Sequence, residues 1–95
     1  MTHKNSCLYL QSAGVFPNPA HEPPQISVWS PAPHQLKIQL FDASGQQLWQ
    51  EEWDVIAGEN RRMVSAQWKS WPTGAYFLSL ADENGQKQIL SLLRQ

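Results

Sequence analysis

The sequence predicts an all-β fold, an antiparallel immunoglobulin-like β-sandwich of six to seven short strands. Three observations support this prediction. No segment shows the apolar spacing that is typical of an amphipathic helix. Short runs of alternating apolar and polar residues are separated by clusters rich in Gly, Pro, Asp and Asn. The connections between the runs are short, which favours antiparallel pairing of strands that are neighbours in the sequence.

The first element is marked by two prolines. Val15 and Phe16 lead into Pro17-Asn18-Pro19-Ala20. Each proline fixes φ near about −65° and lacks an N–H donor, so the segment is expected to be a stiff edge strand at the start of a β-domain. Residues 1–13 are expected to form a disordered or vector-derived lead, and residues 14–95 the sandwich domain.

Three strands are predicted in the first half of this domain. Residues 25–30, 35–40 and 47–55 alternate between apolar and polar side chains. A tight turn with the sequence Asp42-Ala43-Ser44-Gly45 joins the second and third strands into a hairpin, because Asp bonds nearby backbone groups and Gly accepts positive φ. The residues expected to face the core from the second strand are Leu36, Ile38 and Leu40.

Three more strands complete the chain. Ala57-Gly58-Glu59-Asn60 predicts a turn that precedes a strand over residues 61–68. After a loop bent by Pro72 and Gly74, residues 75–81 are apolar on both faces and predict a central, buried strand. Asn84-Gly85 predicts a two-residue type I′ turn before the terminal strand, residues 86–93.

Composition excludes several classes of partner. The 95-residue chain has seven basic and eight acidic residues, a net charge of −1 and no block of either sign. Nucleic acids and anionic membranes favour basic clusters, so neither is expected as the main partner. Cys7, the single cysteine, cannot form an internal disulfide and is expected to be an inert thiol.

Export signals and membrane spans are not visible in this sequence. No apolar run approaches the roughly 18 residues of a membrane-spanning helix, and the N-terminus lacks the pattern of a signal peptide. If the domain acts outside the cytoplasm, a segment N-terminal to it is expected to carry it there.

Catalysis has little support in the sequence. Glu51 is expected on one face of its strand and Glu52 and Asp54 on the other, which argues against a catalytic carboxylate pair. Ser44 lacks the strand-to-helix context of a nucleophile elbow. The three histidines are expected to be solvated loop residues rather than zinc ligands: His3, His21 and His34. No enzyme activity, metal or cofactor is therefore expected.

The five tryptophans support an alternative function. Trp49 and Trp53 share one face of a strand, and outward aromatic side chains are how many carbohydrate-binding modules stack sugar rings. Because a small sandwich needs large side chains in its core, most of the tryptophans are expected to be buried. Trp29 and Trp71 are expected to be the most exposed, and they are the candidates for ligand stacking.

Four motifs in fixed order resemble the type A C-terminal sorting domain of the Bacteroidetes type IX secretion system, also called the Por secretion system. The segment 17–20 resembles the opening of that family, and 40–45 resembles its turn with a hydrophobic residue, Asp and Gly. Gly58-x-Asn60 resembles its next turn. Pro72-x-Gly74-x-Tyr76 resembles its signature, although Trp71 stands where the family usually has leucine. The resemblance covers about residues 14–95.

The resemblance implies a non-enzymatic sorting signal that directs a cargo protein through the outer-membrane translocon. It implies passage through the periplasm to the cell surface or the medium as part of a longer precursor. The implied partners are the translocon and a sortase-like protease, and a homodimer through the sheet edges is also expected. The alternative is a carbohydrate- or protein-binding module of a cell-surface protein. The residues expected to form the recognition and structural motifs are Pro17, Asn18, Pro19, Asp42, Gly45, Gly58, Asn60, Pro72, Gly74, Tyr76, Leu92 and Leu93.

Overall fold

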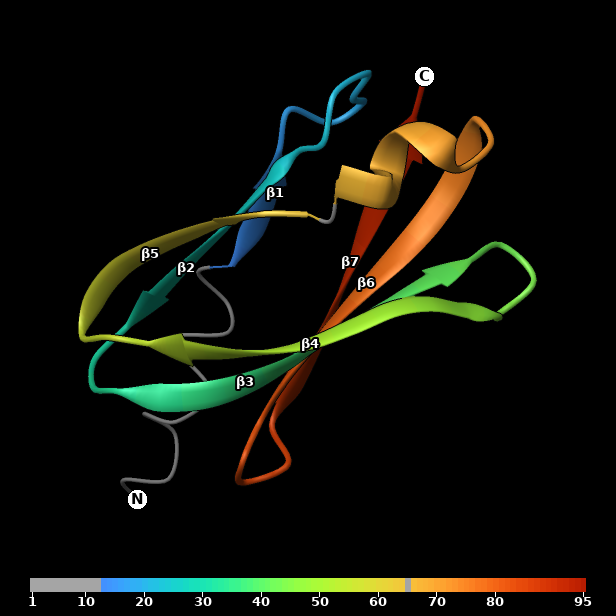
Figure 1. Cartoon of the computed structure of the whole chain (residues 1–95). Coiled ribbons are helices and arrows are strands. Elements are labelled where there is room, and N and C mark those ends of the chain that lie inside the picture. The colour runs from blue at the N-terminus through green and yellow to red at the C-terminus, as the bar shows by residue number, and fades with distance from the viewer. Residues whose placement is uncertain (1–12, 65) are drawn as a thin grey trace.

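Alternating side chains and tight turns produce seven strands in the computed structural model, which describes residues 13–64 and 66–95 (Figure 1). A 3-10 helix spans Ala66–Ser70. The strands are β1 (Gly14–Phe16), β2 (Gln25–Ser30), β3 (His34–Asp42), β4 (Gln47–Val55), β5 (Gly58–Met63), β6 (Gly74–Asp82) and β7 (Lys87–Arg94).

The strands form two antiparallel sheets. The smaller sheet has the order β1-β2-β5, and the larger one the order β4-β3-β6-β7. The predicted antiparallel β-sandwich is therefore confirmed. Strand β6 lies between β3 and β7, as expected for a central strand, so β4 and β7 are the two edges of the larger sheet.

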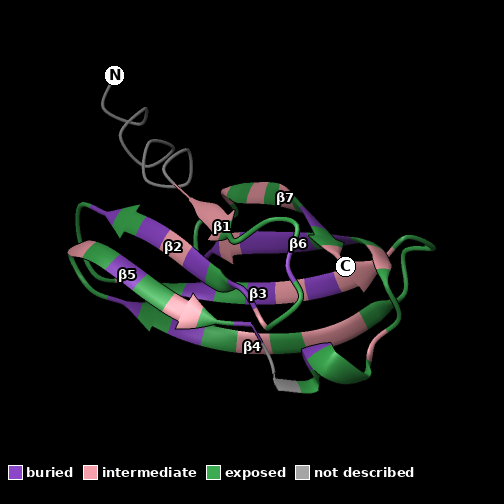
Figure 2. Cartoon of the chain, turned by 90° about the horizontal axis from the view of Figure 1, so that it is seen from above, coloured by how far each residue is buried: buried purple, intermediate pink, exposed green. Residues whose placement is uncertain are grey.

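The core lies between the facing sides of the two sheets (Figure 2). Leu36, Ile38 and Leu40 of β3 are fully buried, which confirms the face predicted from their alternation. Ile26 and Val28 of β2 cover them from the smaller sheet. Packing between apolar faces of this kind is the main source of stability in a small sandwich.

The predicted strand over residues 61–68 is wrong. Strand β5 begins at Gly58 and ends at Met63, so Gly58 and Asn60 lie in a strand rather than in a turn. The Val64 amide donates to the carbonyl of Pro24 (2.8 Å), and the chain then turns into the 3-10 helix. Trp68 of this helix is completely buried in the core.

The predicted two-residue turn at Asn84-Gly85 is also wrong. The Asp82 amide donates to the carbonyl of Gln86 (2.9 Å), so the hairpin loop contains three residues. The Gly85 amide donates to the carbonyl of Asp82 (3.2 Å), and Gly85 has a φ of +88°. A type I turn followed by a left-handed glycine is the usual form of such a loop.

The segment 17–20, here called the strap, links the two sheets. It follows β1 of the smaller sheet and runs parallel to the end of β7 in the larger one, where Ala20 bridges to Arg94. The peptide bonds before Pro17 and Pro19 are cis. His3 and Cys7 lie outside the described residues. Within the part of the chain that the structure describes, no helix is long and apolar enough to cross a membrane.

Candidate recognition site

The motif residue Asp42 stabilises its own turn. Its Oδ1 accepts hydrogen bonds from the backbone amides of Ser44 (2.9 Å) and Gln46 (3.0 Å) and from the Ser44 hydroxyl (2.7 Å). These bonds, the one from the Ser44 hydroxyl above all, lower the pKa of Asp42 from its ordinary value of 3.8. Gly45 closes the turn with a φ of +91°.

The same turn occurs a second time at Asp82. Its Oδ1 accepts from the amides of Asn84 (2.9 Å) and Gln86 (2.8 Å), as Asp42 does from the equivalent positions. Sequence reasoning missed this equivalence. The signal was present, since both hairpin loops have the sequence Asp-x-x-Gly-Gln.

The signature around Tyr76 forms a closed loop. The Tyr76 hydroxyl donates to the carbonyl of Pro72, and Gly74 between them has a φ of +143°. Burial raises the pKa of the Tyr76 hydroxyl above its ordinary value of 10.0. Pro72 and Gly74 therefore bend the chain so that the Tyr76 hydroxyl can reach the carbonyl of Pro72.

The aromatic residues beside this loop pack on one another. The ring centroid of Trp71 lies 6.1 Å from that of Trp68 and 6.2 Å from that of Tyr76. Trp71 is half-buried in this cluster, so of the two tryptophans expected to be the most exposed, Trp29 is the one with an exposed side chain. Because its ring packs against both of these neighbouring rings, Trp71 is a packing residue in this structure.

Arg94, the last residue of β7, links the same cluster to this strand. Its Nε donates to the carbonyl of Trp68 (2.9 Å) and its Nη2 to that of Lys69 (3.2 Å). Its guanidinium also lies 5.8 Å from the Trp68 ring centroid, in cation–π geometry. Sequence reasoning missed this role, because Arg94 and Trp68 are distant in the sequence.

The side chain of Asn18 in the strap bonds the backbone of β7 as a neighbouring strand would. Its side-chain amide donates to the carbonyl of Ser91 (2.9 Å), and its side-chain oxygen accepts from the amide of Leu93 (3.0 Å). Ala20 continues the pairing through its own backbone, with bonds to Leu93 (2.9 Å) and Gln95 (3.0 Å). The two prolines thus present one asparagine that reproduces the bonds of a paired strand.

These motifs meet around Tyr76. A hollow of about 230 Å³ is lined by Asp42 and Ser44 of one turn and by the loop 72–76. A groove of about 270 Å³ on the other side of Tyr76 is lined by Asn18, Phe77, Leu93 and neighbouring residues. The structure therefore brings together the motif residues of the strap, the first hairpin, the signature loop and β7.

Gly58 and Asn60 lie in the smaller sheet and line neither hollow. The Asn60 side chain is buried and bonds the chain on both sides of the turn into β5. Its Oδ1 accepts from the Ile56 amide (2.9 Å), and its Nδ2 donates to the carbonyls of Ile56 (2.9 Å) and Gly58 (3.1 Å). The motif of Gly58 and Asn60 therefore stabilises the turn into β5.

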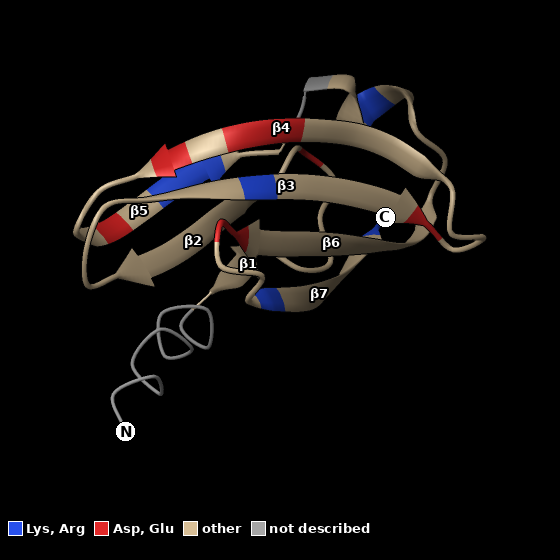
Figure 3. Ribbon diagram, turned by 90° about the horizontal axis from the view of Figure 1, so that it is seen from below, with Lys and Arg blue, Asp and Glu red and all other residues tan. Residues whose placement is uncertain are grey.

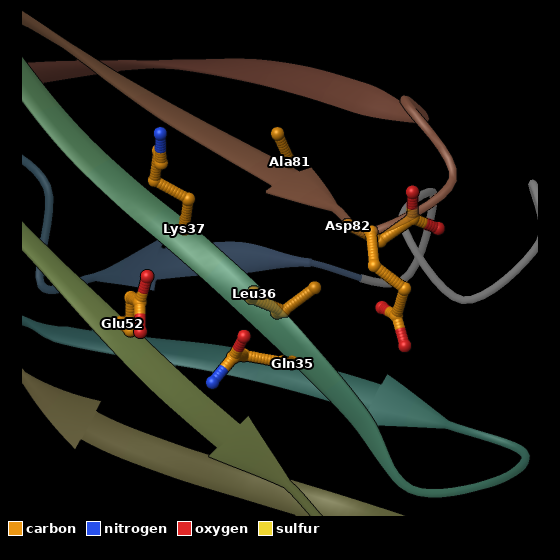
Figure 4. Close-up of a pocket in the computed structure, with 7 residues that line it drawn as sticks. Gln35, Leu36, Lys37, Glu52, Ala81 and Asp82 are labelled. Atoms are coloured by element: carbon orange, nitrogen blue, oxygen red, sulfur yellow. The ribbon is translucent and has the colours of Figure 1, made fainter.

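A third hollow, of about 130 Å³, lies over β3, β4 and the end of β6 (Figure 4). It is lined by Lys37 with Glu52, Asp82 and Glu83, so charges of both signs surround it. No group of three or more His, Cys, Asp or Glu residues that could hold a metal ion occurs within residues 13–64 and 66–95.

The acidic residues of β4 lie as predicted, on opposite faces. Glu51 is half-buried and forms an ion pair with Arg62 of β5, whereas Glu52 and Asp54 are exposed. The remaining tryptophans agree with the expectation of a filled core, since Trp53 and Trp68 are buried and Trp49 packs against the core. Trp29 is 47% exposed, as expected.

Residues 14–91 match the family model described as "Secretion system C-terminal sorting domain". The match includes the strap, both hairpin turns and the signature loop. A search of curated proteins finds no match to the chain.

Proposed function

The chain belongs to the family of secretion system C-terminal sorting domains, which mark proteins for type IX secretion, and on this premise we propose how it acts. The folded sandwich is recognised by the outer-membrane translocon and directs a cargo protein through it. The domain itself catalyses no reaction. The family is one of sorting signals rather than of enzymes, which agrees with this proposal.

The match over residues 14–91 carries the proposal, and the arrangement around Tyr76 supports it. Motif residues from four parts of the sequence line two adjoining hollows there. A surface assembled from distant segments exists only in the folded domain. Recognition of such a surface would let the translocon select cargo whose C-terminal domain has folded.

The same premise suggests the route and the partners. We propose that the domain passes through the periplasm as the C-terminal part of a longer precursor. A sortase-like protease then removes it at the cell surface. Pairing of two copies through the sheet edge at β4 is a further proposal, because β4 is an edge strand of the larger sheet.

A secretion assay tests the proposal. Residues 14–95 would be fused behind a fluorescent reporter that carries a signal peptide. The fusion would be expressed in a type IX-competent bacterium and in a strain that lacks the translocon. We expect reporter outside the competent cells and in the periplasm of the mutant. Retention in both strains would refute the proposed function.

Point variants are better controls for this assay than truncation of the C-terminal strand. Removing residues 89–95 would take away the buried side chain of Leu92 and the bonds of Arg94, so the domain would lose its fold as well as its signal. The reporter with its signal peptide but without residues 14–95 is the matched control for periplasmic delivery.

One observation favours a second candidate function, a binding module for carbohydrate or protein. Trp29 and Phe16 are both exposed on the outer side of the smaller sheet. Gln25, the register partner of Phe16, is four residues from Trp29, a spacing of about 13 Å along β2. Glycan-array binding that is lost in Trp29→Ala would support this function, and an unbound array would exclude it.

A further inference from the structure

The hydrogen-bonding phase of β7 determines which of its backbone groups face outward. The bond from the Asp82 amide to the carbonyl of Gln86 sets this phase. Bonded and non-bonded pairs alternate along an antiparallel ladder, so the pairs Leu80–Gln88 and Leu78–Leu90 exchange bonds. The even-numbered residues of β7 therefore bond to β6, and the odd-numbered ones turn their amides and carbonyls to the outer edge.

The strap closes only the second half of that edge. Asn18 and Ala20 form hydrogen bonds with the outward amide and carbonyl of Leu93. They also bond the carbonyl of Ser91 and the amide of Gln95. Strand β1 lies near β7 but pairs with β2. Within the described residues, no backbone bond covers the outward groups of Lys87 and Ile89 or the amide of Ser91. These three residues are here called the open edge.

The side chains beside the open edge are apolar. Phe77 is 39% exposed, Ile89 53% and Leu93 44%, all on the outer side of the larger sheet. In Figure 3 most of β6 and β7 carries no charge, whereas β4 carries several acidic positions. Register places Ile89 level with Ser79 and Gln39, so in the row of Ile89 the surface becomes polar toward β3.

The apolar part of this surface is small and suits a short partner segment. The exposed parts of Phe77, Ile89 and Leu93 amount to roughly 250 Å². A short extended segment adds backbone hydrogen bonds to a small apolar contact, and this combination gives strand addition its affinity.

Charge further defines the partner. Lys87 is the only charged side chain at the open edge, and no ion pair is recorded for it among residues 13–64 and 66–95. Lys37, on the same face, has Glu52 as its register partner in β4. A carboxylate on the incoming segment would complement Lys87.

From these observations, and resting on the proposed sorting function, we infer that the open edge is the docking strand for an extended segment of the secretion machinery. That segment pairs with the backbone of Lys87, Ile89 and Ser91. It places apolar side chains over Phe77 and Ile89 and an acidic residue beside Lys87. Its pairing ends where Asn18 begins, so the strap fixes the register of the partner.

Export of the reporter fusion with proline variants tests the inference. Ile89→Pro removes an outward amide and no bond to β6, because proline is tolerated where the N–H faces away from the ladder. We expect it to lower surface delivery by up to about tenfold, the effect on binding of losing one backbone hydrogen bond. The matched control is Glu52→Pro, whose amide faces outward from the opposite edge strand β4 by the same alternation.

A second pair of variants keeps the test decisive if a proline variant does not fold. Ile89→Lys puts a charge at the open edge without changing the backbone, and Gln39→Lys puts the same charge in the same cross-strand row on the polar side. Thermal unfolding of each purified domain identifies the folded variants. We expect export to fall only with the Ile89 variants.

The outcomes separate the inference from the proposed function. Export by the unmodified fusion together with normal export by the folded Ile89 variants would overturn the inference and leave the proposed function intact. Equal losses in the Ile89 variants and their controls would also overturn it. If the unmodified fusion is not exported, the proposed function fails and the inference fails with it. A concentration-dependent dimer that Ile89→Lys abolishes would identify a second copy as the occupant instead, and would contradict the inference.

Discussion

Asp42 shows how much of this domain depends on single polar side chains that bond their own backbone. One carboxylate oxygen accepts three hydrogen bonds inside a turn of five residues. Asp82 repeats the arrangement in the second hairpin. Each of these bonds is local, so the shape of both hairpin loops is determined within five residues.

The lowered pKa of Asp42 predicts a dependence of stability on acid. The folded-state pKa lies below 3.8, so the ionised side chain stabilises the fold above that pH, and the contribution is lost as the pH falls through the folded value. Asp42→Asn is expected to flatten the dependence of the unfolding free energy on pH between about 5 and 2. Urea unfolding at several pH values measures this, and identical slopes for the two proteins would contradict it.

Gly74 predicts a second effect at the residue scale. Its φ of +143° is positive, and an added Cβ would meet no atom within 4 Å. A Cβ at this position therefore meets no steric barrier but a strained backbone, and Gly74→Val is expected to destabilise the domain by more than about 1 kcal/mol. Gly14→Ala is the matched control, since Gly14 has similar space but no positive φ. Equal thermal stability of the Gly74 variant and the unmodified domain would refute the expectation.

At the scale of elements, alternation predicted the strands well where one face is buried. The bounds of β2 and β4 agree with residues 25–30 and 47–55. The prediction failed after Met63, where the chain leaves the sheet and Trp68 becomes buried in the core. The local sequence does not show which of the tryptophans will be buried. The loop at Asn84 failed for a different reason, since its carboxylate cap at Asp82 selected a three-residue loop.

The connection from β4 to β5 depends on one buried amide. Asn60 bonds both backbone groups of Ile56, and its replacement would leave those groups without partners. Asn60→Ala is expected to destabilise the domain by about 1–3 kcal/mol, the usual effect of an unsatisfied buried group. Chemical denaturation of this variant and of the exposed control Glu59→Ala measures the difference. A loss no larger than that of the control would be inconsistent with this role.

At the scale of the whole molecule, the family resemblance supplied the motif residues but not their arrangement. The sequence predicted Asn18, Pro72 and Tyr76 as separate motifs. Their assembly into one surface depends on contacts such as that from Asn18 to Ser91, which are 73 residues apart. Arg94 joins the same region through Trp68 and was missed for the same reason. Long-range contacts of this kind follow from the packing of the two sheets and leave no local pattern.

The parallel course of the strap and β7 has a mechanical consequence. When the chain is pulled on the N-terminal side of the strap and at its C-terminal end, the two segments slide past each other, and the bonds of Asn18 and Ala20 are loaded in shear together. Bonds that must break together resist more force than bonds that open one by one. Single-molecule stretching should therefore show a rupture force that falls in Asn18→Ala, and an unchanged force would contradict this. A pull on a cargo attached to the N-terminal side of the domain would load this clamp in shear.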